Sequence, residues 1–154
     1  MSENSARLES VVDTNRFVSG AISPHGSPRR LLRAWYNQRF LLLLSDQQHA
    51  ELTDVLRRPK LEAQFRLDAE ELAQLFSGLD AARRAEPRSV VPVQLRDPND
   101  VMILAAALGG DADYLVTGDN DLLEHQDAAG LGKLRIVTVN KFLAILNDPE
   151  ARRR

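Results

Sequence analysis

Acidic residues behind predicted strands are the groups in this sequence best suited to chemistry. Asp13 follows the predicted strand Leu8–Val12, and both Asp119 and Asp121 follow the apolar run Tyr114–Val116 in YLVTGDNDLL. A turn or a helix N-cap would explain any one of them, because Asp is common at both positions. Of the pair, we expect Asp121 to form the cap, which would leave Asp119 without a structural task.

Two further acids lie on predicted helices. Asp100 lies in or just before the first turn of an apolar helix for which Asp97 or Asn99 is a sufficient cap. The helix dipole would still favour a carboxylate there, so Asp100 has a structural reading as well. Glu51 lies about 100° around its helix from the buried-face residue Leu52. A helical Glu is usually solvated, but no cation stands four residues from Glu51 in either direction.

Carboxylates from several strand ends would meet at one edge of a sheet. Gathered there, they would repel one another and raise one another's pKa unless a cation lay among them. Mg²⁺ and Mn²⁺ take oxygen ligands of this kind. Such ions activate water and stabilise charge on a phosphodiester. The acids therefore suggest a metal-dependent hydrolase without a covalent nucleophile.

Other chemistries have less support from the residues. The three histidines, His25, His49 and His125, lack metal-ligand spacing and are more often surface residues. The absence of cysteine excludes disulfides and thiolate chemistry, and no glycine-rich phosphate-binding motif is present. An aspartyl phosphate on Asp13 is conceivable, but Asn15 stands where an Asp-x-Asp pattern needs its second acid. Asn15 could equally cap a helix and leave Asp13 free.

The elements that must position these acids alternate along the chain. Strands are predicted at Leu8–Val12, Phe40–Leu44, Tyr114–Val116 and 134–139, with a further short strand around 90–93. Helices are predicted to begin at Ser27, Ser45, Asp68, Asp97 and Asn140. This alternation predicts an α/β fold with a parallel sheet covered on both faces. In such sheets the working groups lie beyond the carboxyl ends of the strands.

Composition sets the broad class. The chain has 154 residues, 44% of them hydrophobic and 27% charged, which favours one globular domain at 8–146. We expect a disordered lead-in at 1–7, a polar basic tail at 147–154, no membrane segment and a cytoplasmic location. The net charge of −2 gives no general attraction to nucleic acid. Local arginine clusters are usually solvated helix faces, although they would allow contacts with a phosphate backbone.

Four sequence blocks together resemble the PIN-domain nuclease family. The family's order is followed by the blocks VVDTN, SDQQHAELTDVLRRPKL, RDPNDVMILAAAL and ADYLVTGDNDLL, and the resemblance covers roughly residues 8–146. The second and third blocks look most like the subgroup of toxins from type II toxin–antitoxin pairs, related to VapC. The resemblance implies a three-layer PIN-like α/β fold, with a central parallel sheet of about five strands flanked by helices.

The resemblance also implies Mg²⁺- or Mn²⁺-dependent endoribonuclease activity and a set of site residues. By motif match, the family's acidic catalytic set corresponds to Asp13, Glu51, Asp100 and Asp119. The implied metal ligands are Asp13, Asp100 and Asp119, with Asp121 as a candidate fifth acid, and the supporting polar groups are Asn15 and Thr117. Asp97 matches a position that we interpret as structural. The implied partners are an RNA substrate, a separate antitoxin protein and a second copy of the chain in a homodimer.

One residue departs from the family pattern. Position 16, often apolar in this block, is Arg16. It could point outward, or it could point inward, pair with an acid and weaken metal binding. The alternatives to a ribonuclease are a non-catalytic RNA- or protein-binding module that keeps the fold, and a metal-dependent phosphohydrolase that acts on DNA.

Overall fold

A computed structural model describes residues 7–148 of the chain. Residues 1–6 and 149–154, and with them most of the predicted lead-in and tail, lie outside the described residues. The strands are β1 (Leu8–Val12), β2 (Phe40–Leu44), β3 (Arg83–Arg84), β4 (Tyr114–Val116) and β5 (Arg135–Val137). The helices are α1 (Thr14–Ile22), α2 (Ser27–Tyr36), α3 (Asp46–Leu56), α4 (Pro59–Glu62), α5 (Ala69–Ala81), α6 (Pro98–Gly109), α7 (Asn120–Leu123) and α8 (Val139–Asn147).

The five strands form one sheet in the order β3-β2-β1-β4-β5. Every neighbouring pair is parallel, as the alternation of strands and helices predicts. The register places Ser10 of β1 opposite both Leu42 of β2 and Tyr114 of β4. The central position of β1 brings its carboxyl end beside that of β4.

The prediction of a strand around 90–93 is wrong. That segment carries Pro92, which has no backbone N–H to donate to a neighbouring strand, and Val90 is 78% exposed. The edge strand is β3 instead, which pairs with the end of β2. Arg84 anchors this edge through hydrogen bonds to the carbonyls of Leu79 and Ala82 and to the Asp46 carboxylate.

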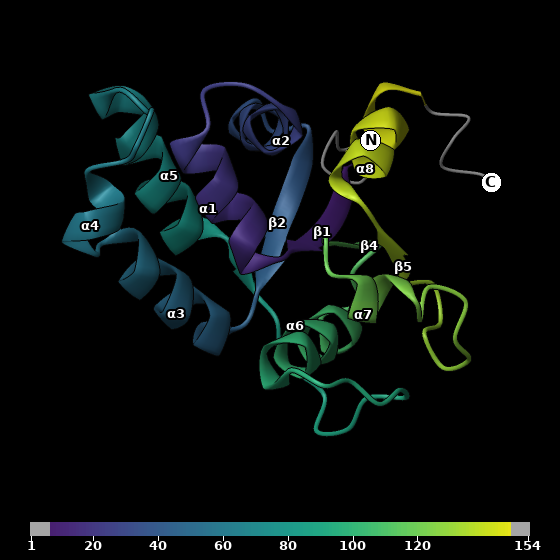
Figure 1. The fold of residues 1–154 in the computed structure, drawn as a ribbon. Helices are drawn as coiled ribbons and strands as arrows, with labels where there is room; N and C mark the ends of the chain where they lie inside the picture. Colours follow the sequence, from purple (N-terminus) through teal and green to yellow (C-terminus); the bar gives the residue numbers. More distant parts are fainter. Residues whose placement is uncertain (1–6, 149–154) are drawn as a thin grey trace.

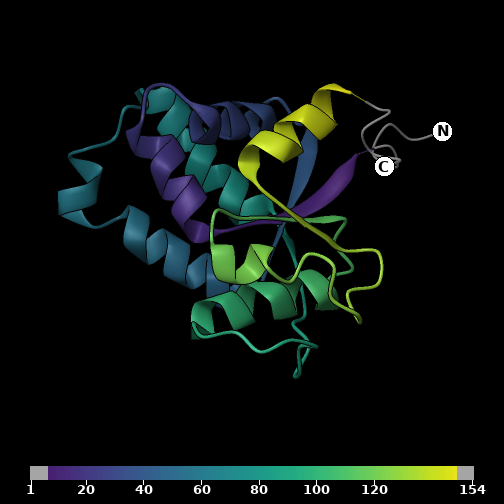
Figure 2. The ribbon, with the colours of Figure 1, turned by 45° about the vertical axis from the view of Figure 1, so that its right-hand side comes forward.

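The sheet separates two layers of helices, as Figures 1 and 2 show. On one face, Val12, Leu44 and Val116 pack with residues of α1, α2, α3, α5 and α8. On the other face, Val11, Leu43 and Leu115 pack chiefly against α6, with Leu122 of α7 beside it. Alternate residues of each strand therefore enter opposite cores. This explains why the run FLLLL in β2 is apolar throughout.

Several helix boundaries differ from the predictions. Gly26, with a φ of 96°, occupies the N-cap position of α2. Ser27, which the sequence pattern predicts as the cap, is already the first helical residue. The sequence pattern predicts no bounds for α1, α4 or α7, although Asp13 or Asn15, and Asp121, are candidate helix caps for the first and the last of them. Two of these have only four residues, and α1 contains β-branched residues and a glycine, which lower helix propensity. Across residues 7–148, no helix combines the length and the apolar character needed to cross a membrane.

Candidate active site

A polar cavity lies at the topological switch point of the sheet, where successive strands change from one side of β1 to the other. From β1 the chain proceeds to β2 and β3 on one side, whereas β4 and β5 lie on the other. Parallel sheets bind ligands in the crevice beyond the strand ends at such a point. The cavity measures about 200 Å³. Its lining residues come from α1, α3, α6 and the segment after β4: Asp13, Thr14, Asn15, Val18, Glu51, Val55, Asp97, Asn99, Asp100, Ile103 and Asp119.

Asp13 is held at the end of β1 by contacts on both carboxylate oxygens. Its Oδ1 accepts a hydrogen bond from the backbone N–H of Asn15 at 3.1 Å, which makes Asp13 the N-cap of α1. Its Oδ2 accepts from the Thr117 hydroxyl at 2.9 Å. The alternative in which Asn15 caps the helix and frees Asp13 is therefore wrong. Asp13 caps the helix and also lines the cavity.

Thr117 links the two central strands at their carboxyl ends. Its side chain is fully buried, and its hydroxyl accepts a hydrogen bond from the backbone N–H of Asp119 at 3.0 Å while donating to Asp13. This chain of two hydrogen bonds fixes the position of Asp13 relative to the segment that carries Asp119. Thr117 therefore contacts both the Asp13 side chain and the Asp119 backbone.

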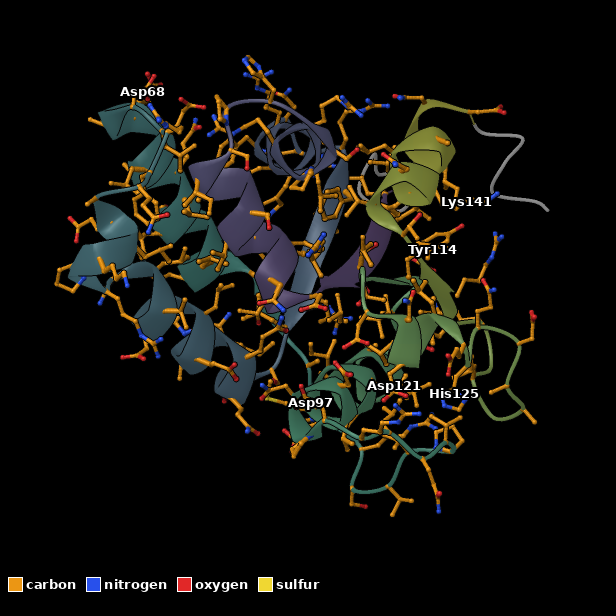
Figure 3. All side chains as sticks on the ribbon, in the orientation of Figure 1. Asp68, Asp97, Tyr114, Asp121, His125 and Lys141 are labelled. Carbon is orange, nitrogen blue, oxygen red and sulfur yellow. The ribbon has the colours of Figure 1, made fainter. Side chains whose placement is uncertain are left out.

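Asp119, and not Asp121, caps the helix that follows β4, and Asp119 also lines the cavity. Asp119 is the N-cap of α7, because its Oδ1 accepts from the backbone N–H of Asp121 at 2.9 Å. The expectation that Asp121 forms this cap is wrong. The Asp121 side chain instead accepts a hydrogen bond from the backbone N–H of Arg96 at 2.9 Å and does not line the cavity. Figure 3 shows Asp121 on α7 and Asp97 at α6.

Asp100 is the most deeply buried acid of the cavity, with 4% of its surface exposed. Asp97 caps α6, as expected, so Asp100 is free of that task and points into the site from the first helical turn. Burial raises the pKa of Asp100 to about 7, with further contributions from a hydrogen bond to Asp119 and from the charges of Asp119, Asp97 and Asp13. At neutral pH the Asp100 carboxyl is therefore about half protonated, and a cation among these acids would lower its pKa.

Glu51 reaches the cavity from α3. It lies on the flank of that helix, beside the fully buried Leu52 and one turn before Val55, which also lines the cavity. No hydrogen bond or ion pair engages the Glu51 side chain within the described residues. By contrast, Asp54 on the outer face of α3 pairs with Arg58 at 3.2 Å. Glu51 thus lines the same cavity as Asp13, Asp100 and Asp119.

Three cavity residues were missed or assigned only structural roles from the sequence. Thr14 lines the cavity, and its buried hydroxyl oxygen has no hydrogen-bond partner. Asp97 and Asn99 also line it, beyond the role of Asp97 in capping α6. The block VVDTN places Thr14 next to Asp13, but a threonine at a helix start gives no signal of its own. Asn15, predicted as a supporting polar group, lines the cavity and is exposed.

The donor set of the cavity suits a hard divalent cation. One oxygen of Asp100 is buried without any partner, as is the Thr14 hydroxyl, and each of the caps Asp13 and Asp119 keeps lone pairs for a further ligand. Oxygen donors of this type are those that Mg²⁺ and Mn²⁺ prefer. In the positions they occupy here, no three His, Cys, Asp or Glu side chains of residues 7–148 form a ready-made ion site. Small side-chain rotations would have to accompany metal binding.

Arg16 does not enter the acidic cavity. Its guanidinium lies against Gly118, and it forms no ion pair within residues 7–148. The idea that Arg16 points inward and neutralises a metal-site acid is therefore wrong. The histidines are also elsewhere: His49 pairs with Asp80, and His125 contacts the Gln94 carbonyl.

Comparison with known protein families agrees with this arrangement. Residues 9–121, well over half of the chain, match the family described as PIN domain. The matched region contains all five acids that line the cavity, and it also contains Thr117. Searches among curated proteins and among solved structures found no match. By its sequence match and by its five-stranded parallel sheet between two helical layers, the chain belongs to the PIN domain family.

Proposed function

We propose that this protein is a Mg²⁺- or Mn²⁺-dependent endoribonuclease. PIN domains are commonly nucleases and generally depend on a divalent metal, which supports hydrolase activity here. The observation that carries the proposal is that one cavity, at the topological switch point of the sheet, is lined by Asp13, Glu51, Asp100 and Asp119. Among these acids, the pKa of Asp100 is raised to about 7.

Three of these acids would hold the ion. Asp13, Asp100 and Asp119 come from adjacent places at the carboxyl end of the sheet, and Glu51 faces them from α3. When bound, a divalent ion in such a site activates water and stabilises charge on the phosphodiester. Asp121 points to Arg96 and is not needed for this ligand set.

The protein's own residues prepare the site in three ways. The hydrogen bonds through Thr117 keep the Asp13 carboxylate oriented, so that little reorganisation is needed when the substrate binds. The raised pKa of Asp100 makes that carboxyl the group that exchanges a proton for a cation near neutral pH. Glu51, unpaired on α3, is within the same cavity and is suited to accept a proton from an attacking water.

The decisive experiment measures cleavage of a labelled single-stranded RNA with Mg²⁺, with Mn²⁺ and with EDTA. We expect cleavage that requires metal and that falls about 100- to 1,000-fold in Asp100→Asn, because several kcal/mol of charge stabilisation would be lost. Asp54→Asn is the matched control, since Asp54 lies on the outer face of α3 and pairs only with Arg58.

The same assay separates the alternatives. Metal-dependent cleavage of DNA of the same sequence, but not of RNA, would replace the ribonuclease with a deoxyribonuclease. Binding of RNA without cleavage of either polymer would favour a non-catalytic binding module. Full activity in Asp100→Asn would show that the acidic cavity is not the site of cleavage.

We further propose that the activity serves as the toxin of a type II toxin–antitoxin pair, with a separate antitoxin chain and a homodimeric toxin. The support is the resemblance of the second and third sequence blocks to the VapC-related toxin subgroup. Induced expression in bacteria should arrest growth, whereas Asp100→Asn should not. Growth arrest by both proteins, or by neither, would contradict the toxin role while leaving the nuclease assay unaffected.

A further inference from the structure

A second cavity lies next to the acidic one and has the opposite electrostatic character. It measures about 270 Å³ and lies among the starts of α2 and α8 and the end of β4. Its polar lining consists of Arg16, Ser27, Thr117, Thr138 and Asn140, and no acidic residue of the described chain lines it. A cavity with one cation and several neutral hydrogen-bonding groups is suited to an anion.

Arg16 is the charged group of this cavity, and its side chain has no hydrogen-bond or ion-pair partner among residues 7–148. Its Nε is buried without a hydrogen bond, and its guanidinium forms no ion pair within residues 7–148. Leaving a buried guanidinium donor unpaired costs free energy, and a ligand would recover it. The guanidinium lies flat against Gly118, where an added Cβ would be 3.2 Å from Cζ and from Nη1. Glycine at 118 thus makes room for this position of Arg16.

Thr117 connects the two cavities through a hydrogen bond. Thr117 lines the Arg16 cavity, while its hydroxyl donates to the Asp13 carboxylate of the acidic cavity. Arg16 itself is three residues from Asp13, and its backbone N–H donates to the Asp13 carbonyl at 2.9 Å. A ligand that occupies both cavities must therefore present one group to the acids and a neighbouring anionic group to Arg16.

We propose that the Arg16 cavity binds a backbone phosphate of the RNA, next to the phosphodiester that is cleaved. This inference rests on the proposed nuclease function. A guanidinium offers a planar fork of donors that matches two phosphate oxygens, and the Ser27 and Thr138 hydroxyls lie in the same cavity. Arg16 also offsets the repulsion that the carboxylates exert on a polyanion. The arginine at position 16 is then a substrate-binding residue of this chain.

The test compares RNA binding by variants that cannot cut the RNA. In an Asp100→Asn background with Mg²⁺, the anisotropy of a fluorescent single-stranded RNA is measured over a range of salt concentrations. Arg16→Gln should weaken binding about 10- to 100-fold and reduce the slope of log K against log salt by about 0.7, as expected for one lost phosphate contact. Arg16→Lys, which keeps the charge without the fork, should restore part of the affinity.

Arg33→Gln is the matched control. Arg33 is exposed on α2, does not line either cavity and undergoes the same change of charge. It should keep both the affinity and the salt slope of the parent. Urea unfolding of each variant checks that the fold is retained.

A change on the RNA identifies the contacted group. Phosphates of the RNA are replaced one at a time by uncharged methylphosphonates. In the parent, we expect one substitution beside the cleaved bond to weaken binding as much as Arg16→Gln does, and the combination of both changes should weaken it no further. If Arg16→Gln weakens binding but every methylphosphonate still acts independently of it, the phosphate assignment is wrong.

The outcomes separate this inference from the proposed function. If the wild-type protein cleaves RNA and Arg16→Gln binds as Arg33→Gln does, the nuclease assignment stands and the phosphate site is overturned. If the wild-type protein neither binds nor cleaves RNA, both are overturned. Cleavage by the wild-type protein, together with losses from Arg16→Gln and from a single methylphosphonate that do not add, supports both.

Discussion

At the scale of single residues, the acids of this site combine a structural role with the proposed chemical one. Asp13 and Asp119 each use one oxygen to cap a helix, and both line the cavity. Asparagine is also a good N-cap, because its side-chain oxygen accepts the same hydrogen bond. Asp-to-Asn substitutions therefore remove the charge while they preserve the cap. This separates effects on chemistry from effects on folding.

Asp119 and Asp121 form the sharpest comparison. We expect Asp119→Asn to lose RNA cleavage by about 100-fold or more, because a cavity carboxylate is removed. Asp121→Asn should keep cleavage near the wild-type rate, since Asp121 points to the Arg96 N–H and its oxygen can be replaced by that of an amide. Initial rates of cleavage of a labelled RNA measure both. Equal losses in the two variants would show that Asp121 also enters the site.

Asp100 predicts a dependence of stability on pH. Its pKa is raised from the ordinary value of 3.8 to about 7, so the folded protein holds this proton more tightly than the unfolded chain does. Without metal, the Asp100 carboxyl therefore does not destabilise the fold below about pH 4, where it is protonated in both states. Its destabilising effect grows between about pH 4 and 7 and stays constant above about pH 7. Asp100→Asn should remove this effect.

The measurement is urea unfolding of both proteins in EDTA at several pH values. The advantage of Asp100→Asn should grow from pH 4 to pH 7, and reach on the order of 1–4 kcal/mol above pH 7. A stability difference that stays constant across this range would mean that Asp100 titrates normally.

At the scale of elements, a buried arginine holds α1 in place. Arg29 of α2 has 3% of its surface exposed. Its Nε donates to the carbonyl of Gly20 at 2.7 Å, near the end of α1, and its Nη2 donates to the carbonyl of Arg66 at 3.1 Å. Glu71 of α5 lies 3.9 Å from the same guanidinium. The helix that begins at Asp13 is thus tied to α2 and to the segment before α5.

Arg29→Met should destabilise the protein by about 2–4 kcal/mol, because buried carbonyls and a carboxylate lose their donor. Arg30→Met is the natural control, since Arg30 is the next residue of the same helix and is exposed. It should change stability by less than about 0.5 kcal/mol. Chemical denaturation measures the free energy of unfolding of both variants. Similar losses of stability in the two would contradict this role of Arg29.

At the scale of the whole molecule, the acids belong to different layers. Asp13 and Glu51 are carried by the start of α1 and by α3, on one side of the sheet, whereas Asp100 and Asp119 are carried by α6 and the start of α7, on the other. An ion bound by acids from both sides would join the two helical layers across the end of the sheet. Binding should therefore stabilise the fold as a unit.

Thermal unfolding with Mn²⁺ tests this coupling. At a metal concentration ten times the dissociation constant, we expect Tm to rise by about 3–6 °C. Asp100→Asn should show little of this rise, although its own Tm without metal is expected to be higher at pH 7.5. An equal rise in the variant would place the ion elsewhere.

Local patterns in the sequence determined much of this protein. The cap of α6 at Asp97, the capping box of Asp68 with Glu71 and the fully apolar strand β2 are all as predicted, because each depends on residues within one or two turns. The positions of the acids behind β1 and β4, together with the parallel sheet, likewise predicted that Asp13 and Asp119 would meet.

Only the tertiary structure decided which way individual side chains point. Asp119 and Asp121 are two residues apart and chemically identical, and the backbone N–H of Arg96, distant in sequence, draws one of them away. Arg16 turns from the acids because Gly118 leaves room for it beside a second cavity. The edge strand β3 forms because β2 offers unpaired backbone groups to Arg83 and Arg84, which carry no strand pattern. Each of these outcomes depends on contacts between segments far apart in the chain. The residue pattern within one segment carries no information about such contacts.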